Sequence, residues 1–373
     1  MTCSPVALTS AAARWLTIVP LTLLLAACGG ESFTDSQRCE PFETLTPYCD
    51  FQSPEDLVIA PDGTALVISE FGQMGEVEGQ LTLFDLSSEE RYLLYNSASS
   101  NDQSLGNPLW GDSDCAEPET FSPHGIDLSQ RPSGRWQLLV VNHGERETID
   151  MFELLRDDNQ RWQLAWRGCA EAIDDSSFND VAAVGDGFVT TRMISRTAGL
   201  SGMLDYFLGR DTGWVWHWSL ANGFQQVPGT MGVMPNGILA SADGQQLYVN
   251  MYGQNLLQVI DRASGELVRE TELVSADNSN WDVERPGKIL VASHEFNFMD
   301  MTSCMTSGSA NCSVEFEIIE LDTQTLQKTT LLRADGAFFG GGTAAVRVGD
   351  DLYIGSFAGT RLLKAPVGYG VTR

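Results

Sequence analysis

Hydrophobic and polar residues alternate along most of the chain in short runs, and many of these runs come in pairs separated by a glycine-containing turn. A period of two is typical of β-strands with one buried face, and two such runs around a turn predict a β-hairpin. Helical periodicity is nearly absent. Six stretches carry the paired pattern, and they cover residues 55–69, 124–142, 179–191, 236–250, 281–293 and 342–356.

Further strand-like runs lie between the hairpins, at residues 80–86, 148–155, 256–262 and 316–322. Four strands per repeat and six repeats of roughly 58 residues predict an all-β fold, a six-bladed β-propeller with four-stranded blades around a central channel. Two stacked sheets would contain similar strands, but six comparable hairpins favour radial repetition. We expect the propeller to occupy residues 47–373.

The N-terminal segment has the pattern of an export signal. Arg14 precedes an apolar run over residues 15–25, which is shorter than the roughly 20 residues that a membrane-spanning helix needs. The run leads into Leu-Ala-Ala-Cys, which resembles a bacterial lipoprotein cleavage site with Cys28 as the lipidated residue. We expect a signal peptide over residues 1–27, a tether over 28–46, and a place in the bacterial cell envelope, with the outer membrane or periplasm favoured. An ordinary secretory signal with a chance cysteine is the alternative.

Charge narrows the possible partners. The chain has 22 Lys and Arg residues against 50 Asp and Glu residues, a formal net charge of −28. Such a surface repels nucleic acid and anionic lipid. We therefore expect no nucleic-acid partner and contact with the membrane only through the lipid anchor. We also expect a monomer with a small-molecule substrate.

Cysteine usage is consistent with an exported protein. Six cysteines remain when the two in the N-terminal segment are set aside, and an even number suggests disulfides. The expected pairs are Cys39–Cys49, Cys304–Cys312 and Cys115–Cys169. Six cysteines allow fifteen pairings, so other connectivities stay open. No Cys-x-x-Cys or His-rich spacing indicates zinc.

Two of the four histidines, His124 and His143, stand symmetrically about the Ser133-Gly134 turn. Because antiparallel strands return to their starting end, both histidines should lie at the same end of one blade. That end also collects His294 and the leading residues of the other inner strands. These leading residues are Glu55-Asp56, Asn179-Asp180, Asn236 and Asp277-Asn278. The fourth histidine, His217, lies in Trp-Val-Trp-His-Trp, where we expect it to pack.

The side chains predicted at this end are mostly oxygen donors. Carboxylate and amide oxygens in an irregular ring suit Ca²⁺, and a calcium ion can polarise a carbonyl group while a nearby imidazole takes a proton from water. Taken singly, each has a plain alternative, because Asn-Asp and Asn-Gly are common turn dipeptides and a buried histidine is more often a core group. Their recurrence at one place in the repeat favours a site.

Several motifs occur in the order seen in the paraoxonase/arylesterase family, which this chain resembles from about Glu55 to Ala365. They are EDLVIAPDG (55–63), SPHGIDL (122–128), LLVVNH (138–143), FNDVAAVG (178–185), PNGI (235–238) followed by ADG, and DNSNWD (277–282). Gluconolactonase and strictosidine-synthase propellers share the blade pattern but lack the histidine pair. The resemblance implies a six-bladed propeller that binds two calcium ions in its channel and hydrolyses lactones and aryl esters.

The resemblance also assigns roles to residues. A catalytic calcium would be held by Glu55, Asn179, Asn236, Asp277 and Asn278. A deeper structural calcium would be held by Asp56, Asp180 and the backbone carbonyl of Ile126. His124 would be the general base and His143 its partner. A shifted alignment of DNSNWD would offer Asn280 or Asp282 in place of Asp277 and Asn278.

Departures from the family concern the substrate pocket. The loop of residues 70–79 is shorter than the family's active-site lid, and Arg192 replaces an Asn-Asp-His stretch. Arg192 and His294 are expected beside the pocket, where Arg192 either recognises a carboxylate of the substrate or pairs with a surface acid. Two other functions stay open, a non-catalytic calcium-stabilised binding propeller and a gluconolactonase-like sugar lactonase.

Overall fold

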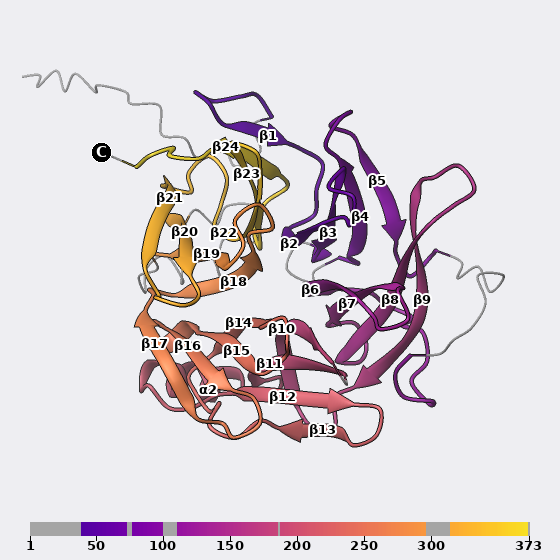
Figure 1. Ribbon diagram of the computed structural model, residues 1–373, viewed down its shortest axis with the longest axis vertical. Helices are drawn as coiled ribbons and strands as arrows, with labels where there is room; N and C mark the ends of the chain where they lie inside the picture. The colour runs from indigo at the N-terminus through magenta and orange to yellow at the C-terminus, as the bar shows by residue number, and fades with distance from the viewer. Residues whose placement is uncertain (1–38, 73–76, 100–109, 186, 296–313, 372–373) are drawn as a thin grey trace, which may run out of the picture. The chain divides into compact units, whose positions relative to one another are not determined.

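The computed structural model describes residues 39–72, 77–99, 110–185, 187–295 and 314–371. Their strands form six antiparallel sheets of four strands each, arranged as blades around a centre (Figure 1). In five blades the four strands follow one another along the chain, and in the sixth the N-terminal strand completes a blade made by the last three. The predicted six-bladed propeller is confirmed.

The first three blades are built alike, with the innermost strand first along the chain and the outermost strand last. Blade one contains β2 (Pro54–Ile59), β3 (Ala65–Glu70), β4 (Gln80–Asp85) and β5 (Arg91–Tyr95). Blade two contains β6 (Pro123–Gln130), β7 (Trp136–Asn142), β8 (Thr148–Arg156) and β9 (Trp162–Glu171). Blade three contains β10 (Ser176–Val184), β11 (Gly187–Ser195), β12 (Trp214–Ser219) and β13 (Gly223–Gln226).

The second half of the ring repeats this arrangement from the inside outward. Blade four contains β14 (Pro235–Ala240), β15 (Gln246–Met251), β16 (Leu256–Asp261) and β17 (Leu267–Glu272). Blade five contains β18 (Ala276–Trp281), β19 (Lys288–His294), β20 (Phe316–Asp322) and β21 (Lys328–Ala334). Blade six contains β22 (Gly342–Val348), β23 (Asp351–Ser356), β24 (Leu362–Pro366) and β1 (Thr46–Tyr48).

The ring is closed by the pairing of β1 with β24. The Cys39–Cys49 disulfide clips the segment that leads into β1. Leu45 is buried, so the folded chain begins slightly before the expected start of the propeller at residue 47. Because the two ends of the chain share one sheet, the propeller has no free seam between its first and last blades.

Hydrophobic side chains fill the spaces between blades. Each of the six main core clusters joins residues of two neighbouring blades, so that every interface around the ring has its own core. For example, Leu57 and Leu66 of blade one pack with Val346 of blade six. The alternation read from the sequence is the signature of these inward-facing side chains.

Two elements differ from the sequence-based expectation. The pattern predicts the fifth hairpin from residue 281, but β18 begins at Ala276. Its first residues are polar yet buried, because they face the channel, so they do not show the alternation of a half-buried strand. One helix, α2 (Gly199–Phe207), interrupts the connection from β11 to β12 and was not predicted.

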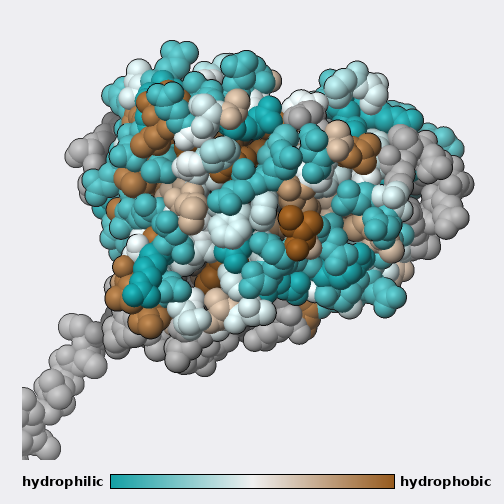
Figure 2. Space-filling view, turned by 90° about the horizontal axis from the view of Figure 1, so that it is seen from below, coloured by the Kyte–Doolittle hydropathy of each residue, from teal (hydrophilic) through white to brown (hydrophobic). Residues whose placement is uncertain are grey.

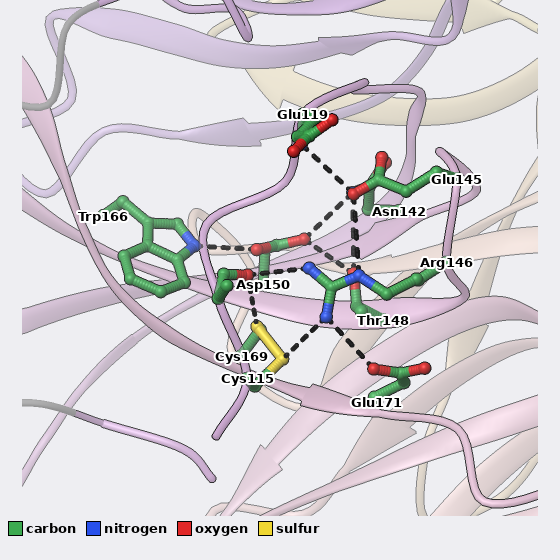
Figure 3. The surroundings of a disulfide bond; sticks show 11 residues. Cys115, Glu119, Asn142, Glu145, Arg146, Thr148, Asp150, Trp166, Cys169 and Glu171 are labelled. Carbon is green, nitrogen blue, oxygen red and sulfur yellow. Dashed lines mark hydrogen bonds and ion pairs between the residues drawn. A yellow bond between two sulfur atoms is a disulfide. The ribbon is translucent and has the colours of Figure 1, made fainter. Parts of the chain in front are cut away.

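The Cys115–Cys169 disulfide ties the segment before β6 to β9 (Figure 3). Together with Cys39–Cys49, it confirms two of the three expected pairs. The expected Cys304–Cys312 pair and Cys28 lie outside the described residues. No helix in the described ranges is long and apolar enough to cross a membrane. Figure 2 shows a largely hydrophilic face with hydrophobic residues in small, separate groups, in keeping with the acidic composition.

Candidate functional site

Each of the six inner strands breaks its register with the neighbouring strand near its first residues. The breaks lie between Pro54 and Asp56, Pro123 and Ile126, Phe178 and Val181, Pro235 and Ile238, Ala276 and Ser279, and Gly342 and Ala345. A β-bulge of this kind adds a residue to one strand and re-aims its side chains. The predicted ligand and base positions lie at these breaks, which explains how one blade after another can direct polar groups into the channel.

Glycines allow the inner strands to approach one another at the breaks. A Cβ atom on Gly125 would lie 2.6 Å from the carbonyl oxygen of Asn179, and one on Gly237 would lie 2.4 Å from that of Asp277. No side chain fits at such distances without moving the backbone. This close approach gives a physical reason for the glycine in both Pro-His-Gly and Pro-Asn-Gly.

The five residues predicted to hold a catalytic calcium are all buried, with exposed fractions between 1% and 6%. Four of them present an oxygen atom that accepts no hydrogen bond. These atoms are Oε2 of Glu55 and the Oδ1 atoms of Asn179, Asn236 and Asn278. A buried acceptor without a donor costs about 1–3 kcal/mol, so four such oxygens in neighbouring blades form a set suited to a cation.

Contacts between blades draw these residues together. The Asn278 side chain donates to Oε1 of Glu55 at 2.7 Å, across more than two hundred residues of sequence. The alternative residues in the same motif point elsewhere, since Asn280 donates to the carbonyl oxygen of Leu57 and Asp282 pairs with Arg347. The geometry therefore favours Asp277 and Asn278 over the shifted alignment.

The pKa values of the buried carboxylates also indicate that this site suits a cation. Burial raises the pKa of Glu55 well above its usual value, and the charges of Asp56, Asp277 and Asp180 raise it further, whereas the Asn278 hydrogen bond lowers it. Burial also raises the pKa of Asp277 to about 7. Buried carboxylates that repel one another are stabilised by a bound cation.

The two aspartates predicted to hold a deeper calcium also tie blades together. Asp56 accepts the backbone N–H groups of Leu57 and Ile126, each at 2.8 Å. Asp180 accepts those of Val181 and Ile238, each at 2.7 Å. Burial is the main cause that raises both pKa values, to about 7 for Asp56. The carbonyl of Ile126, rather than its N–H, is the predicted ligand.

Amide oxygens dominate the candidate donor sets. Within the described ranges, no group of three or more His, Cys, Asp and Glu side chains is placed to hold a metal ion. The five residues predicted to hold the catalytic calcium, called the upper set below, instead combine two carboxylates with three asparagines. This mixture of hard oxygen donors suits Ca²⁺. The unpaired oxygens of Glu55, Asn179, Asn236 and Asn278 show that these residues fit such an ion.

His124 lies beside this set with one nitrogen already engaged. Its Nδ1 atom lies 2.9 Å from the carbonyl oxygen of Asn179, and its Nε2 atom lies 3.7 Å from Oε1 of Glu55. A carbonyl can only accept, so Nδ1 carries the hydrogen and Nε2 carries the lone pair. Burial, with a smaller effect of His143, lowers the pKa of His124 to about 3, which keeps the imidazole neutral.

His143 packs against His124, with ring centroids 5.1 Å apart. Its Nδ1 atom lies 3.0 Å from the carboxylate of Glu147, a residue that the sequence analysis missed. Phe71 covers both imidazoles edge-on, with centroids 4.8 Å from His124 and 5.6 Å from His143. The histidine pair is therefore held between an aromatic ring and a buried carboxylate.

A ring of six equivalent positions surrounds the mouth of this site. Each residue directly follows the second-strand residue that pairs with the inner strand just before the register break. The six residues are Phe71, His143, Met193, Tyr252, His294 and Phe357. All but His294 are partly exposed, and three of the six residues are Phe or Tyr. His143 and His294 were expected at this end from the sequence, whereas the uneven spacing of the six positions along the chain hid the other four.

The two predicted pocket residues are both engaged by the protein. His294 is buried, with Nε2 at 2.8 Å from the carbonyl oxygen of Gly342 and Nδ1 at 3.3 Å from the hydroxyl of Tyr252. It still lies beside the donor set, since Nε2 is 3.8 Å from Oδ2 of Asp277. His294 thus forms part of the wall of the channel.

Arg192 points away from the donor set. Its guanidinium donates to Asp175 at 3.1 Å and to the carbonyl oxygen of Thr212, and it stacks on Trp214 at 4.2 Å. Of the two roles expected for Arg192, this geometry matches pairing with a surface acid.

A cavity of about 570 Å³ lies at the opposite end of blades two to four. The hairpin turns line it, including Arg131, Gly185 and Gly244, together with Trp110 and Trp281. These turns are at the far ends of the strands from His124 and His143, so this cavity is separate from the histidine site.

The chain is similar to known proteins in its family and in its fold. A family model described as Arylesterase matches residues 56–365. A luciferin-regenerating enzyme has 14% identity and a TM-score of 0.49, with 86% of this chain and 96% of that chain covered. Regucalcin from Agrobacterium tumefaciens, described as a calcium-binding protein, has 14% identity and a TM-score of 0.45, with 85% and 91% covered. No curated protein matches the chain.

Proposed function

The chain belongs to the arylesterase family, and we propose that it is a calcium-dependent hydrolase of lactones and aryl esters. Membership supports a hydrolase that acts on esters of this class. The proposed calcium dependence and residue roles are supported by the side chains that face the channel. The observation that carries them is the group of unpaired buried oxygens on Glu55, Asn179, Asn236 and Asn278 beside the lone-pair nitrogen of His124.

Glu55, Asn179, Asn236, Asp277 and Asn278 would hold the catalytic calcium, and Asp56, Asp180 and the Ile126 carbonyl a second, structural one. A calcium ion in the upper set would polarise the substrate carbonyl and stabilise the oxyanion that forms on it. In this proposal Nε2 of His124 accepts the proton of the attacking water, while the Asn179 carbonyl holds the ring in place. The proton then passes to the leaving alkoxide, and a lactone opens to a hydroxy acid.

The mouth of the channel favours apolar substrates. Phe71, Tyr252 and Phe357 occupy three of the six ring positions, and Met193 occupies a fourth. Aromatic and thioether groups bind aliphatic chains and aryl rings and offer few hydrogen bonds to the hydroxyls of a sugar. We therefore place aliphatic lactones and aryl esters ahead of sugar lactones.

The direct test is a substrate panel with the full chain in detergent. δ-Valerolactone, a long-chain γ-lactone, glucono-δ-lactone and phenyl acetate would each be assayed with calcium and with excess EGTA. Calcium-dependent turnover of the apolar substrates would support the proposal, and a preference for the sugar lactone would reassign the substrate class. Calcium-dependent thermal stability without turnover of any substrate would make the protein a binding propeller.

We also propose that Cys28 is lipidated and tethers the propeller to the bacterial envelope, through residues 28–46. The support is the sequence Leu-Ala-Ala-Cys after a short apolar run. Metabolic labelling with a palmitate analogue should mark the wild type and leave Cys28→Ala unlabelled. Equal labelling of the two proteins would refute the anchor.

A further inference from the structure

Glu147 is a buried carboxylate that has no role in the reaction described above. It is 3% exposed, and both of its carboxylate oxygens lie 3.0 Å from Nδ1 of His143. One of them also accepts the backbone N–H of Phe178, the residue before the predicted ligand Asn179. The guanidinium of Arg196 lies 3.7 Å from the other and supplies a positive charge at the surface side.

This contact determines which nitrogen of His143 carries the hydrogen. An ionised carboxylate can only accept, so Nδ1 of His143 must donate and Nε2 must carry the lone pair. A carboxylate behind a histidine fixes the tautomer and the orientation of the ring and stabilises the imidazolium when a proton arrives. His143 has this arrangement, and His124 has a neutral carbonyl in the same place.

The segment that carries both residues is clamped to its surroundings. The side-chain oxygen of Asn142 accepts the backbone N–H of Gly144 within this segment and that of Ser122 just before β6. Glu145 accepts the N–H and the hydroxyl of Thr120. Arg146 pairs with Glu171 at 3.0 Å and contacts the Cys115–Cys169 disulfide (Figure 3). Glu147 is thus placed by a rigid turn, which suits a group that must hold an imidazole at a set angle.

We propose that Glu147 is a positioning residue that holds His143 in the Nδ1–H tautomer and against His124. The inference rests on the proposed hydrolase function. The Glu147 carboxylate contacts His143 and the backbone N–H of Phe178, and it would act on the site through these two contacts.

The test uses the calcium-loaded full chain in detergent, with its four histidines labelled with ¹⁵N. Glu147→Gln keeps an oxygen for the Phe178 N–H but removes the charge that binds His143. Glu147→Asp keeps the charge. Glu145→Gln is the matched control, because Glu145 lies in the same turn and accepts backbone N–H groups but does not touch His143. Lactone kinetics and the ¹⁵N tautomer signals are measured for all four proteins.

We expect Glu147→Gln to lose the Nδ1–H tautomer of His143 and to lower kcat by about 10- to 100-fold while KM changes by about twofold or less. Glu147→Asp should recover part of kcat, and Glu145→Gln should match the wild type. A His143 tautomer that persists in Glu147→Gln, or a kcat equal to that of Glu145→Gln, would overturn the inference. A wild type without any turnover would overturn the proposed function instead, and the ¹⁵N spectra alone would then decide the role of Glu147.

Discussion

The Nδ1 atom of His124 lies 2.9 Å from the backbone carbonyl oxygen of Asn179, whose own side-chain oxygen has no hydrogen-bond donor. The candidate base on blade two and a candidate metal ligand on blade three are therefore built as one unit. A shift between these two blades would therefore disturb the candidate base and the candidate ligand at the same time. This coupling keeps the lone pair on Nε2 of His124, beside Glu55.

The unpaired oxygens predict that calcium stabilises the fold. A ligand that binds only the native state adds about 2.7 kcal/mol at a hundred times its dissociation constant. Excess calcium should therefore raise the melting temperature of the wild type, and Glu55→Gln should lose most of that increment. Glu70→Gln is the control, because Glu70 is equally buried but pairs with Arg91 outside the channel. Equal calcium increments in the two variants would contradict the assigned site.

The raised carboxylate pKa values predict an unusual pH dependence of the metal-free protein. Asp56 and Asp277 have folded-state pKa values of about 7, above the usual aspartate value of 3.8. The native state then binds more protons than the unfolded state between these values, so stability falls as the pH rises through this range. Urea unfolding of demetallated protein should give a lower free energy at about pH 8 than at about pH 5. Added calcium should reverse this trend, and a metal-free stability that rises towards pH 8 would contradict the prediction.

Replacement of His124 should separate catalysis from binding. His124→Gln removes the base, and the loss of general-base catalysis typically costs about 10²- to 10⁴-fold in rate. Calcium-dependent stabilisation should remain, because the unpaired oxygens are untouched. His217→Gln, on the third strand of blade three, should retain full turnover. Undiminished lactone hydrolysis by His124→Gln would remove His124 from the mechanism.

The Cys115–Cys169 disulfide should stabilise the blade that carries the histidine pair. It spans 54 residues and lies beside the Arg146–Glu171 ion pair (Figure 3). Removal of a disulfide of this kind typically costs about 2–4 kcal/mol. The double variant Cys115→Ser/Cys169→Ser should lose about this amount in urea unfolding, and an unchanged free energy of unfolding would contradict a stabilising role.

Much of the architecture could be predicted from the sequence because a repeated hairpin leaves a repeated pattern. Alternation located the inner strands of five blades, and the symmetry of His124 and His143 about one turn placed both at the same end. The polar start of β18 escaped the pattern, since its side chains face the channel and not a hydrophobic core. Helix α2 also escaped, because nine residues within a connection give too short a periodic signal.

The sequence predicts site residues only where they occupy equivalent positions in the hairpin repeat. The bulges at the start of each inner strand have no signature in composition, and they decide which side chains enter the channel. Glu147 follows His143 by four residues in a polar turn and looks like a solvated charge, but it is buried by contacts with another blade. The partners of Arg192 likewise depend on the distant segment around Thr212.

In the proposed mechanism, hydrolysis requires calcium bound by the channel oxygens. The most direct measurement is the initial rate of δ-valerolactone hydrolysis against free calcium concentration, for the wild type and for Asn236→Ala. Asn236→Ala removes one unpaired oxygen, which should weaken calcium binding by about tenfold or more, since 1.4 kcal/mol corresponds to a factor of ten. We predict a saturable calcium dependence whose midpoint shifts by that factor in the variant. A wild-type rate that stays unchanged when free calcium is removed would contradict the proposed calcium requirement.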